Sequence, residues 1–322
     1  MRVSVIVPTY RRPDSLRLCL LALARQQSGP DEILVVANSD DHASHEVVRT
    51  APAPVRLVTT DRSGVVAKMN AGLDAAAGDL IVLTDDDSQP HPDWLERLVG
   101  TFDGDGQIAA VGGRDRLYFR GQPWRGPDQP VVGKVDSLGR VTGNHHTGVG
   151  PARDVDVLKG VNLGVRTELL RRVRFDERLV GVGTQTHWEL ALCLTLRRAG
   201  FRIIYDPEIA VDHHPQPRID DSRQFGPAEL RDAVHNRTLA LLEYLPAGRR
   251  PLHLAWAMLV GTGVSPGLAQ LVRRAPKGPR AAWRSFVATQ TGILQGVRAY
   301  RACRHGHGQA QGTTTNIPSE IT

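Results

Sequence analysis

Two patterns of apolar and polar residues alternate along the first 90 positions of the chain. Short apolar runs predict buried strands, and segments with apolar residues three or four positions apart predict helices between them. Alternation at this spacing is typical of a doubly wound, mostly parallel sheet. The predicted strands are residues 3–7, 32–36, 55–59 and 80–84, and the predicted helices are residues 14–27, 45–50 and 65–77.

The pattern changes after residue 112. Residues 112–159 are rich in glycine, proline and polar residues, and a stretch this long predicts functional loops folded over a site. The apolar spacing of residues 189–198 predicts a helix, and short strands are expected at residues 201–205 and 209–211. From about residue 215 onward the pattern is helical, beginning with a predicted helix at residues 227–245.

Three regions follow from this reading of the 322-residue chain. We expect an α/β domain over residues 1–215, with a mostly parallel, Rossmann-like sheet flanked by helices. A basic helical extension is expected over residues 216–304. Residues 305–322 are rich in glycine, glutamine and threonine, which predicts a disordered tail. The first strand begins at the third residue, so we expect no signal peptide before the fold.

Charge separates these regions. From Arg249 onward the chain has ten Lys or Arg residues and one acid, Glu320, whereas the first 248 residues have 30 basic and 33 acidic residues. A basic surface can bind nucleic acid or an anionic membrane. No nucleic-acid-binding motif accompanies it, so we expect no nucleic acid partner and a peripheral membrane contact through residues 249–304.

Two segments of this extension bear on the membrane. Residues 251–272 contain no Lys, Arg, Asp or Glu, and 22 residues would suffice for a span. Three glycines, Pro266 and several polar residues make the segment weakly hydrophobic, so we expect a packed or interfacial hairpin. Residues 280–301 predict a helix with apolar residues gathered at helical spacing. That helix fits a membrane surface or packing on the core equally well.

Cysteine usage points to a reducing compartment. Cys19, Cys193 and Cys303 lie far apart, and their spacing matches no metal site. Buried free thiols in the cytoplasm are the expectation, so we place the protein in the cytoplasm, with the inner face of the cell membrane as the alternative.

Three consecutive carboxylates end the fourth predicted strand. Asp85, Asp86 and Asp87 follow the apolar run of residues 80–84. Ligands of open α/β sheets bind at the carboxyl ends of strands, and carboxylate oxygens suit Mg²⁺ or Mn²⁺. The alternative is a solvated loop or helix cap, where aspartate is also common.

An ordered series of motifs from residue 3 to about residue 214 resembles glycosyltransferase family 2, the inverting, nucleotide-sugar-dependent enzymes with a GT-A fold. Any one motif is weak, but their order along two-thirds of the chain is specific. The motifs are Val5–Arg12, Arg62–Gly64, Asn70–Gly72, Ala77–Asp79, Thr84–Asp87, Gly160–Asn162, Phe175–Glu177, Trp188–Glu189, Arg197–Gly200, Tyr205–Glu208 and His213.

The resemblance implies a divalent cation, Mn²⁺ or Mg²⁺, bound by Asp87, Asp85 and His213. The adjacent His214 is an alternative ligand, and Asp212 could orient either imidazole ring. Asp86 is read as a donor contact or as simply solvated.

The resemblance also implies a nucleotide-sugar donor. The aspartate that usually ends the second strand is missing, and Asn38 or Asp40 could replace it, so UDP-, dTDP- and GDP-sugars all stay open. The residues expected to contact the donor are Pro8, Thr9, Tyr10, Arg12, Asn38, Asp61, Arg62, Lys68, Asp85, Asp86, Asn162 and Trp188.

The catalytic base implied by the family falls on Glu189. Inverting transfer needs a carboxylate that takes the proton of the acceptor hydroxyl. The usual acid before this position is Trp188 here, and the acid two residues later is Ala191. We expect residues 85–87 and Glu189 to meet across one cleft.

Other readings stay open. A nucleotidyltransferase shares the sheet and the acidic site, but the turn after residue 7 lacks the glycine-rich loop of those enzymes. A binding protein with a decayed fold is the non-catalytic alternative. The acceptor could be lipid-linked, a glycan precursor or a soluble small molecule. Asn144, His145 and His146 could reach the donor or acceptor, or form a solvated loop.

Overall fold

The computed structural model describes residues 1–52, 54–216 and 226–307. The chain divides into two compact units. Unit 1 is Met1–Lys134, Thr142–Phe175 and Gly200–Pro217, and unit 2 is Val135–Val141, Asp176–Ala199 and Arg218–Thr322, each as far as it is described. The helix containing Glu189 therefore belongs to unit 2, although the sequence grouped it with residues 1–215.

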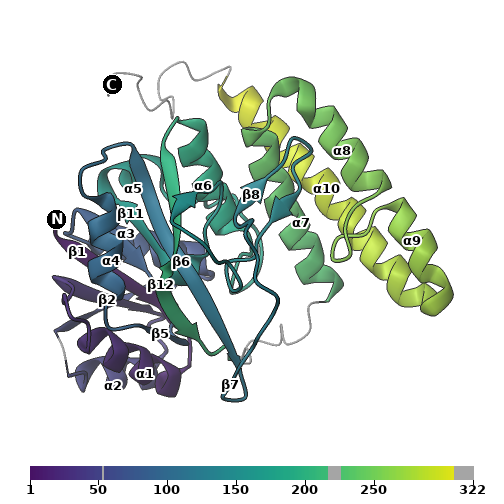
Figure 1. Ribbon diagram of the computed structural model, residues 1–322. Coiled ribbons are helices and arrows are strands. Elements are labelled where there is room, and N and C mark those ends of the chain that lie inside the picture. Colours follow the sequence, from purple (N-terminus) through teal and green to yellow (C-terminus); the bar gives the residue numbers. More distant parts are fainter. Residues whose placement is uncertain (53, 217–225, 308–322) are drawn as a thin grey trace. The chain divides into compact units, whose positions relative to one another are not determined.

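Unit 1 is built on one mixed sheet with the order β10-β12-β6-β11-β4-β1-β2-β3 (Figure 1). The pairs β1–β2, β2–β3, β1–β4 and β6–β12 are parallel, and β11 runs antiparallel to both of its neighbours. The expected α/β class with a mostly parallel sheet and a C-terminal helical region is confirmed. The strands are β1 (Val3–Pro8), β2 (Glu32–Ala37), β3 (Val55–Thr59), β4 (Leu80–Leu83), β5 (Ser88–Pro90), β6 (Ile108–Phe119), β7 (Gln122–Pro123), β10 (Arg153–Asp154), β11 (Leu163–Arg166) and β12 (Arg202–His213).

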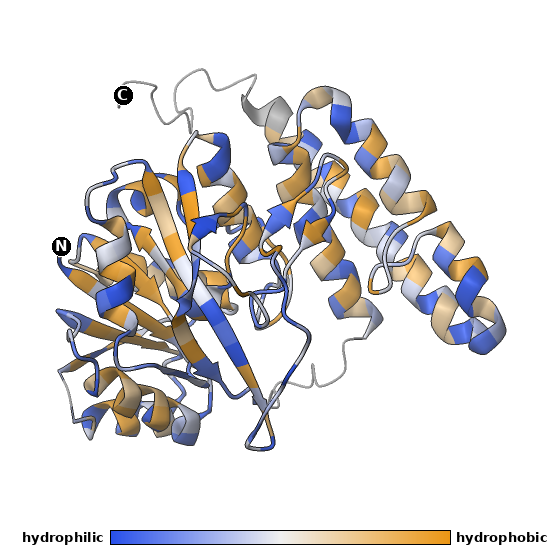
Figure 2. Ribbon diagram, viewed as in Figure 1, coloured by the Kyte–Doolittle hydropathy of each residue, from blue (hydrophilic) through white to orange (hydrophobic). Residues whose placement is uncertain are grey.

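Strand side chains alternate between the two faces of this sheet. Val3, Val5 and Val7 of β1 join one buried cluster with α1 (Pro13–Ala24), α2 (His42–Arg49) and α4 (Trp94–Phe102). The intervening Ile6 faces α3 (Val65–Ala75), where a side chain on Gly72 would collide with it. Both faces are covered, which explains the unbroken apolar runs in the sequence and in Figure 2.

The carboxyl end of β4 is tied directly to the carboxyl end of β12. After the three aspartates, β5 pairs antiparallel with β12, and Ser88 lies opposite His213. Residues far apart in the sequence therefore meet at one edge of the sheet.

The middle of the chain is more regular than expected. The long strand β6 takes up Ile108–Phe119, so only the remainder is built of loops and short strands, among them β8 (Lys134–Val135) and β9 (Val141–Thr142). The prediction of loops from residue 112 was wrong at its start, because small glycines at 112 and 113 allow close approach of neighbouring backbone rather than a turn.

Unit 2 is helical. Its longest pair, α7 (Pro227–Tyr244) and α10 (Pro279–His307), packs closely because Gly292 and Gly296 of α10 lie against the backbone of α7. The helices of the two units not yet named are α5 (Thr167–Val173), α6 (Trp188–Arg198), α8 (Arg250–Leu259) and α9 (Leu268–Arg274), with 3-10 turns at Gly160–Asn162, Ala247–Arg249 and Ala275–Lys277.

Two expectations for the C-terminal region are settled by these helices. Residues 251–272 form two helices around a tight turn rather than one continuous helix, and among the described residues no helix has the length and hydropathy needed to cross a bilayer. A disordered tail was expected from residue 305, but α10 continues to His307. Residues 308–322 lie outside the described part. Cys19 and Cys193 are buried as expected, whereas Cys303 is half-buried.

Candidate active site

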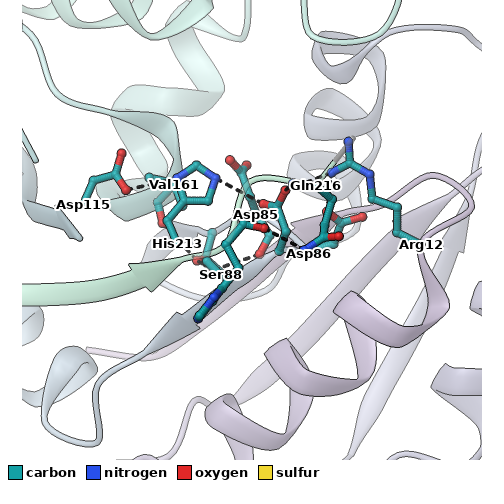
Figure 3. A network of polar contacts seen from close by, with 11 residues as sticks. Arg12, Asp85, Asp86, Ser88, Asp115, Val161, His213 and Gln216 are labelled. Carbon is teal, nitrogen blue, oxygen red and sulfur yellow. Dashed lines mark hydrogen bonds and ion pairs between the residues drawn. The ribbon is translucent and has the colours of Figure 1, made fainter. Parts of the chain in front are cut away.

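Asp85, Asp87 and His213 form a cluster at the carboxyl edge of the unit 1 sheet (Figure 3). One ligand atom from each residue lies within 4.8 Å of the others. The two aspartates come from the turn after β4, and the histidine is the last residue of β12. Two carboxylates and an imidazole suit Mn²⁺, and the carboxylates also suit Mg²⁺. The three residues expected to bind a metal are thus brought together, and their donor atoms fit one divalent cation.

Asp115 holds the imidazole of His213 from the other side. The Nδ1 atom of His213 lies 3.0 Å from Oδ1 of Asp115, and its Nε2 lies 3.3 Å from Oδ1 of Asp87. Burial lowers the pKa of His213, but its bonds to the two carboxylates outweigh this effect and raise the pKa to about 10. Figure 3 shows the ring between Asp115 and the acidic turn. This geometry turns Nε2 toward the cluster.

The alternatives for this histidine fare differently. Asp212, expected as a partner of either ring, instead pairs with His91 at 3.0 Å. His214 stacks on Tyr118, with ring centroids 4.8 Å apart. The cluster therefore includes His213 and not His214. Sequence reasoning missed Asp115, which becomes visible only when β6 is paired with β12.

Asp86 is buried rather than solvated, so that reading was wrong. The residue is 4% exposed, and its carboxylate accepts hydrogen bonds from Thr9 at 2.7 Å and from Arg12 at 3.1 Å. Burial raises the pKa of Asp86 to about 6, against the opposing effect of Arg12. Arg12 also pairs with Asp87 at 3.1 Å. Asp86 therefore fixes the strand β1 terminus and Arg12 beside the cluster.

Asp87 is held through both its side chain and its backbone. Its carboxylate accepts from the backbone N–H of Gln216, and its backbone carbonyl accepts from the N–H of His214. Burial raises the pKa of Asp87, but its bonds to His213, Gln216 and Arg12 together hold it below the usual value. An ionised, preoriented carboxylate is what a cation ligand requires.

The residues expected around the donor occupy several settings. Tyr10 follows β1, and the Nζ atom of the buried Lys68 lies 5.1 Å from the centre of its ring. Pro8 ends β1 and is half-buried. Asp61 and Arg62 lie on the loop before α3, with exposed side chains. Their donor contacts stay predictions.

Asn38 and Asp40, the two candidates at the end of β2, differ sharply. The Oδ1 atom of Asn38 is buried and has no hydrogen-bond partner within the described chain. Asp40 is exposed and pairs with Arg11 at 2.7 Å. A buried acceptor left without a donor is costly, so Asn38 is the better candidate for a ligand contact.

Asn162 has a role different from the expected donor contact. It is completely buried, its Nδ2 donates to the carbonyl of Ile209 at 2.9 Å, and its Oδ1 accepts from Nε1 of Trp94 at 2.8 Å. A longer bond joins Nδ2 to the carbonyl of Arg114. The amide is fully used in bracing β12 and α4, which is a structural task.

The glycine-rich segment gives His145 a structural position too. His145 is buried, and its Nε2 lies 2.9 Å from the carbonyl of Val157. Burial lowers its pKa to about 4, so the ring is neutral at pH 7. His146 packs edge-on against Trp124, and the side chain of Asn144 donates to the carbonyl of Val131. His145 is therefore neither part of a solvated loop nor directed at a substrate, which were the two alternatives for this segment.

Glu189 and Trp188 open α6 in unit 2. Glu189 is half-buried in the first turn of the helix, where the helix dipole favours a carboxylate. Trp188 is buried, and the donor contact expected of it stays a prediction. The meeting of Glu189 with residues 85–87 stays a prediction.

Residues 4–157 match the sequence model of the family described as glycosyl transferase family 2. These residues belong to glycosyltransferase family 2. The expected family is therefore confirmed for the part of the chain that contains the three aspartates and Asp115.

Two curated relatives extend the similarity beyond this region. Glycosyltransferase AglE of Haloferax volcanii is 34% identical over 193 residues, which cover 58% of this chain and 59% of the relative. Pre-mycofactocin glycosyltransferase of Mycobacterium tuberculosis is 27% identical over an alignment of 324 positions, gaps included. The alignment covers 94% of this chain and 64% of the relative. The chain thus spans less than two thirds of either relative.

A solved structure shares the GT-A fold of this chain. The mannosyltransferase PcManGT of Pyrobaculum calidifontis, solved with GDP-Man and Mn²⁺, is 20% identical and has a TM-score of 0.54. The match covers 93% of this chain and 87% of that chain. The expected fold is confirmed by this likeness.

Proposed function

We propose that this protein transfers a sugar from a nucleotide-diphospho-sugar to an acceptor hydroxyl, with inversion at the anomeric carbon. The observation that carries the proposal is the convergence of Asp85, Asp87 and His213 within 4.8 Å at the edge of the sheet where α/β folds bind nucleotides. Membership of residues 4–157 in a glycosyltransferase family supports it.

Asp85, Asp87 and His213 would hold one divalent cation, Mn²⁺ or Mg²⁺. When bound there, such an ion neutralises a diphosphate and stabilises it as a leaving group. The protein's own contribution is to fix the ligands. Asp115 orients the imidazole, and the backbone of Gln216 holds Asp87. Arg12, within 3.1 Å of Asp86 and Asp87, offsets part of the repulsion between these two carboxylates.

Asn38 supports a choice among nucleobases. Its buried Oδ1 has no donor in the described chain, and it would accept a hydrogen bond from a base that carries a ring N–H. Uracil, thymine and guanine carry such a group next to a carbonyl, whereas adenine and cytosine do not. UDP-, dTDP- and GDP-sugars therefore remain the donors that we propose. Thermal stabilisation by UDP, dTDP and GDP but not by ADP or CDP would test this choice.

Glu189 is proposed as the base that removes the proton of the acceptor hydroxyl. The helix dipole favours a carboxylate in the first turn of a helix, and a carboxylate can act as the base. The glutamate side chain is longer than the aspartate common in the family, so it extends further toward an acceptor.

A lipid-linked acceptor or a cell-surface glycan precursor is the acceptor that we favour, used at the cytoplasmic face of a membrane. The basic extension beyond Arg249 supports this choice. The runner-up is a soluble small molecule. It is favoured by the similarity of 94% of this chain to a relative named for pre-mycofactocin rather than for a lipid. A GT-A-like nucleotidyltransferase is disfavoured because the turn after β1 has no glycine.

The proposed chemistry is tested by Glu189→Gln, with Glu96→Gln as the matched control. Both glutamates lie in the first turn of a helix, so loss of charge at the helix dipole is the same in the two variants. Glu189→Gln should lower transfer by roughly 10³-fold or more while Mn²⁺-dependent binding of the nucleoside diphosphate persists. Glu96→Gln should retain transfer. Retained transfer in Glu189→Gln would show that the base is another residue.

A further inference from the structure

Helix α8 exposes an apolar face while it buries another. His253 and Ala257, four positions apart, are buried, and Ala257 belongs to the core of unit 2. On the opposite side, Leu252, Ala255 and Leu259 share one face at helical spacing and are exposed. A helix in a soluble unit normally carries polar residues on its outer face, so a second apolar face indicates a further contact.

The turn after α8 and the helix α9 continue this feature. Val264 at the turn and Val272 of α9 are each 67% exposed, and Leu268, one helical turn before Val272, is also exposed. Gly261 adopts a left-handed conformation, and an antiparallel bridge to Pro266 closes the turn. The exposed valine is thus held on a structured turn, and its exposure is not explained by an open loop.

Helix α10 combines an apolar stripe with arginines. Gly292 and Gly296 pack against α7, whereas Trp283, Val287 and Leu294 share another face of α10 and are exposed. The spacing of Arg280, Arg284 and Arg298 places them beside this stripe. Exposed apolar residues flanked by arginines are typical of a helix that lies in a membrane interface.

An open groove of about 380 Å³ borders the stripe. It runs between the start of α7 and α10, and Trp283, Val287 and Ala288 provide its apolar wall. Arg231 and Arg284 also line it. Apolar walls beside guanidinium groups suit an acyl chain with an anionic headgroup.

We propose that the exposed faces of α8, α9 and α10, together the lipid face, dock unit 2 on an anionic phospholipid surface. Residues 249–307 contain ten Lys or Arg residues and no acid, so the charge matches an anionic bilayer. The same charge disfavours a second copy of this face, because pairing would bring like charges together. The many exposed aliphatic side chains disfavour nucleic acid. This docking would bring the protein to the surface where the proposed lipid-linked acceptor lies. The observations that support the docking all come from unit 2.

Flotation of the full chain with vesicles tests the docking. Vesicles of equal parts phosphatidylcholine and phosphatidylglycerol should carry the wild type, and pure phosphatidylcholine should not. The double variant Arg280→Glu, Arg284→Glu should partition roughly 25-fold more weakly or worse, because each arginine contributes about fivefold. The double variant Trp283→Ser, Val272→Ser should partition roughly tenfold more weakly.

Matched changes in unit 1 serve as controls. Arg2→Glu with Arg25→Glu makes the same change in net charge, and Leu18→Ser with Val131→Ser also removes two exposed apolar side chains. Both controls should float like the wild type. Thermal melting of every variant separates lost docking from lost folding.

Three outcomes would overturn the docking. The wild type could fail to float with anionic vesicles, or the unit 1 controls could lose binding as much as the lipid-face variants. Alternatively, the wild type could self-associate through Trp283, which would make a second copy the occupant. Sugar transfer to a soluble acceptor, measured in the same variants, stays unchanged if only docking is lost. A failure of docking therefore leaves the proposed transfer reaction untouched.

Discussion

The two units of this protein use charged side chains in opposite ways. At the carboxyl edge of the unit 1 sheet, Asp86, Asp87 and Asp115 are buried. Each of these carboxylates is bonded to a neighbouring side chain: Thr9 to Asp86, Arg12 to Asp87 and His213 to Asp115. On α8–α10 of unit 2, arginines are exposed among exposed apolar residues. The buried carboxylates of unit 1 are held at fixed positions. The exposed arginines of unit 2 together create a positive electrostatic potential over one face.

This difference decides what mutations should do. Buried, bonded charges act through geometry, so a change from carboxylate to amide should alter ligand binding at one site. Exposed charges act through their total, so each single substitution should weaken binding to an anionic surface only slightly, and the effects of several substitutions should add. The predictions below test the buried groups of unit 1 and the helix packing of unit 2, and the flotation experiment tests the exposed charges.

Asp87→Asn should have the largest effect. The substitution removes a cation ligand that His213, Gln216 and Arg12 hold in place, so kcat/KM for sugar transfer should fall by roughly 10³-fold. The rate at increasing Mn²⁺ concentration is the measurement. Asp14→Asn, at an exposed aspartate of α1, is the control and should retain activity. A normal rate at ordinary Mn²⁺ concentration in Asp87→Asn would contradict the account.

Asp115→Asn should weaken Mn²⁺ binding by about 10- to 100-fold, since it removes the carboxylate that orients His213. Titration calorimetry measures the affinity without any turnover. Asp212→Asn is a strict control, because Asp212 is the chain neighbour of His213 but bonds His91 instead. Equal effects of the two substitutions would mean that Asp115 has no positioning role.

His145 should make the stability of the protein pH-dependent. Its folded pKa of about 4 lies below the ordinary 6.5, so the unfolded chain takes up the proton first. The stability of the fold does not depend on this ring above pH 6.5, where the ring is neutral in the folded and the unfolded chain. As the pH falls toward 4, protonation of the ring in the unfolded chain lowers the free energy of unfolding. Between pH 7.5 and pH 4.5 it should lower the free energy of unfolding by about 2.5 kcal/mol.

Denaturant unfolding at the two pH values measures this loss in the wild type, in His145→Gln and in His42→Gln. The exposed His42 is the control and should leave the loss unchanged. His145→Gln should reduce the loss. An unchanged pH dependence in His145→Gln would show that burial of this ring does not set it.

Gly292→Ala should destabilise unit 2 by about 1–3 kcal/mol. A Cβ atom there would lie 2.5 Å from the carbonyl oxygen of Arg231 and 2.8 Å from Val234. Gly100→Ala in α4, where the space is open, should instead stabilise the protein by up to about 1 kcal/mol. Thermal melting compares them, and the same sign for both would contradict the close packing of α7 and α10.

The sequence was enough to predict the elements that depend on local pattern. The apolar runs gave β1 to β4, and the motif order placed Asp85, Asp87 and His213 in one site. Asp115 was not predictable in this way, because its contact with His213 depends on the pairing of β6 with β12.

Burial explains the other misreadings. Asp86 and Asn162 look like polar residues free to bind a ligand, yet neighbours from distant strands and helices use their hydrogen bonds. Local pattern cannot show which polar groups the fold will enclose. Local pattern also could not decide whether the apolar stripe of α10 packs on the core or faces lipid, since both kinds of stripe have the same spacing.

Pulsed electron paramagnetic resonance of the Mn²⁺-loaded protein tests the central claim most directly, because it detects nitrogen atoms bound to the ion. The account predicts one bound Mn²⁺ per chain with coupling to a single imidazole nitrogen, and the loss of this coupling in His213→Gln. Coupling that persists in His213→Gln, or a bound ion without any nitrogen ligand in the wild type, would contradict the cluster of Asp85, Asp87 and His213 as the cation site.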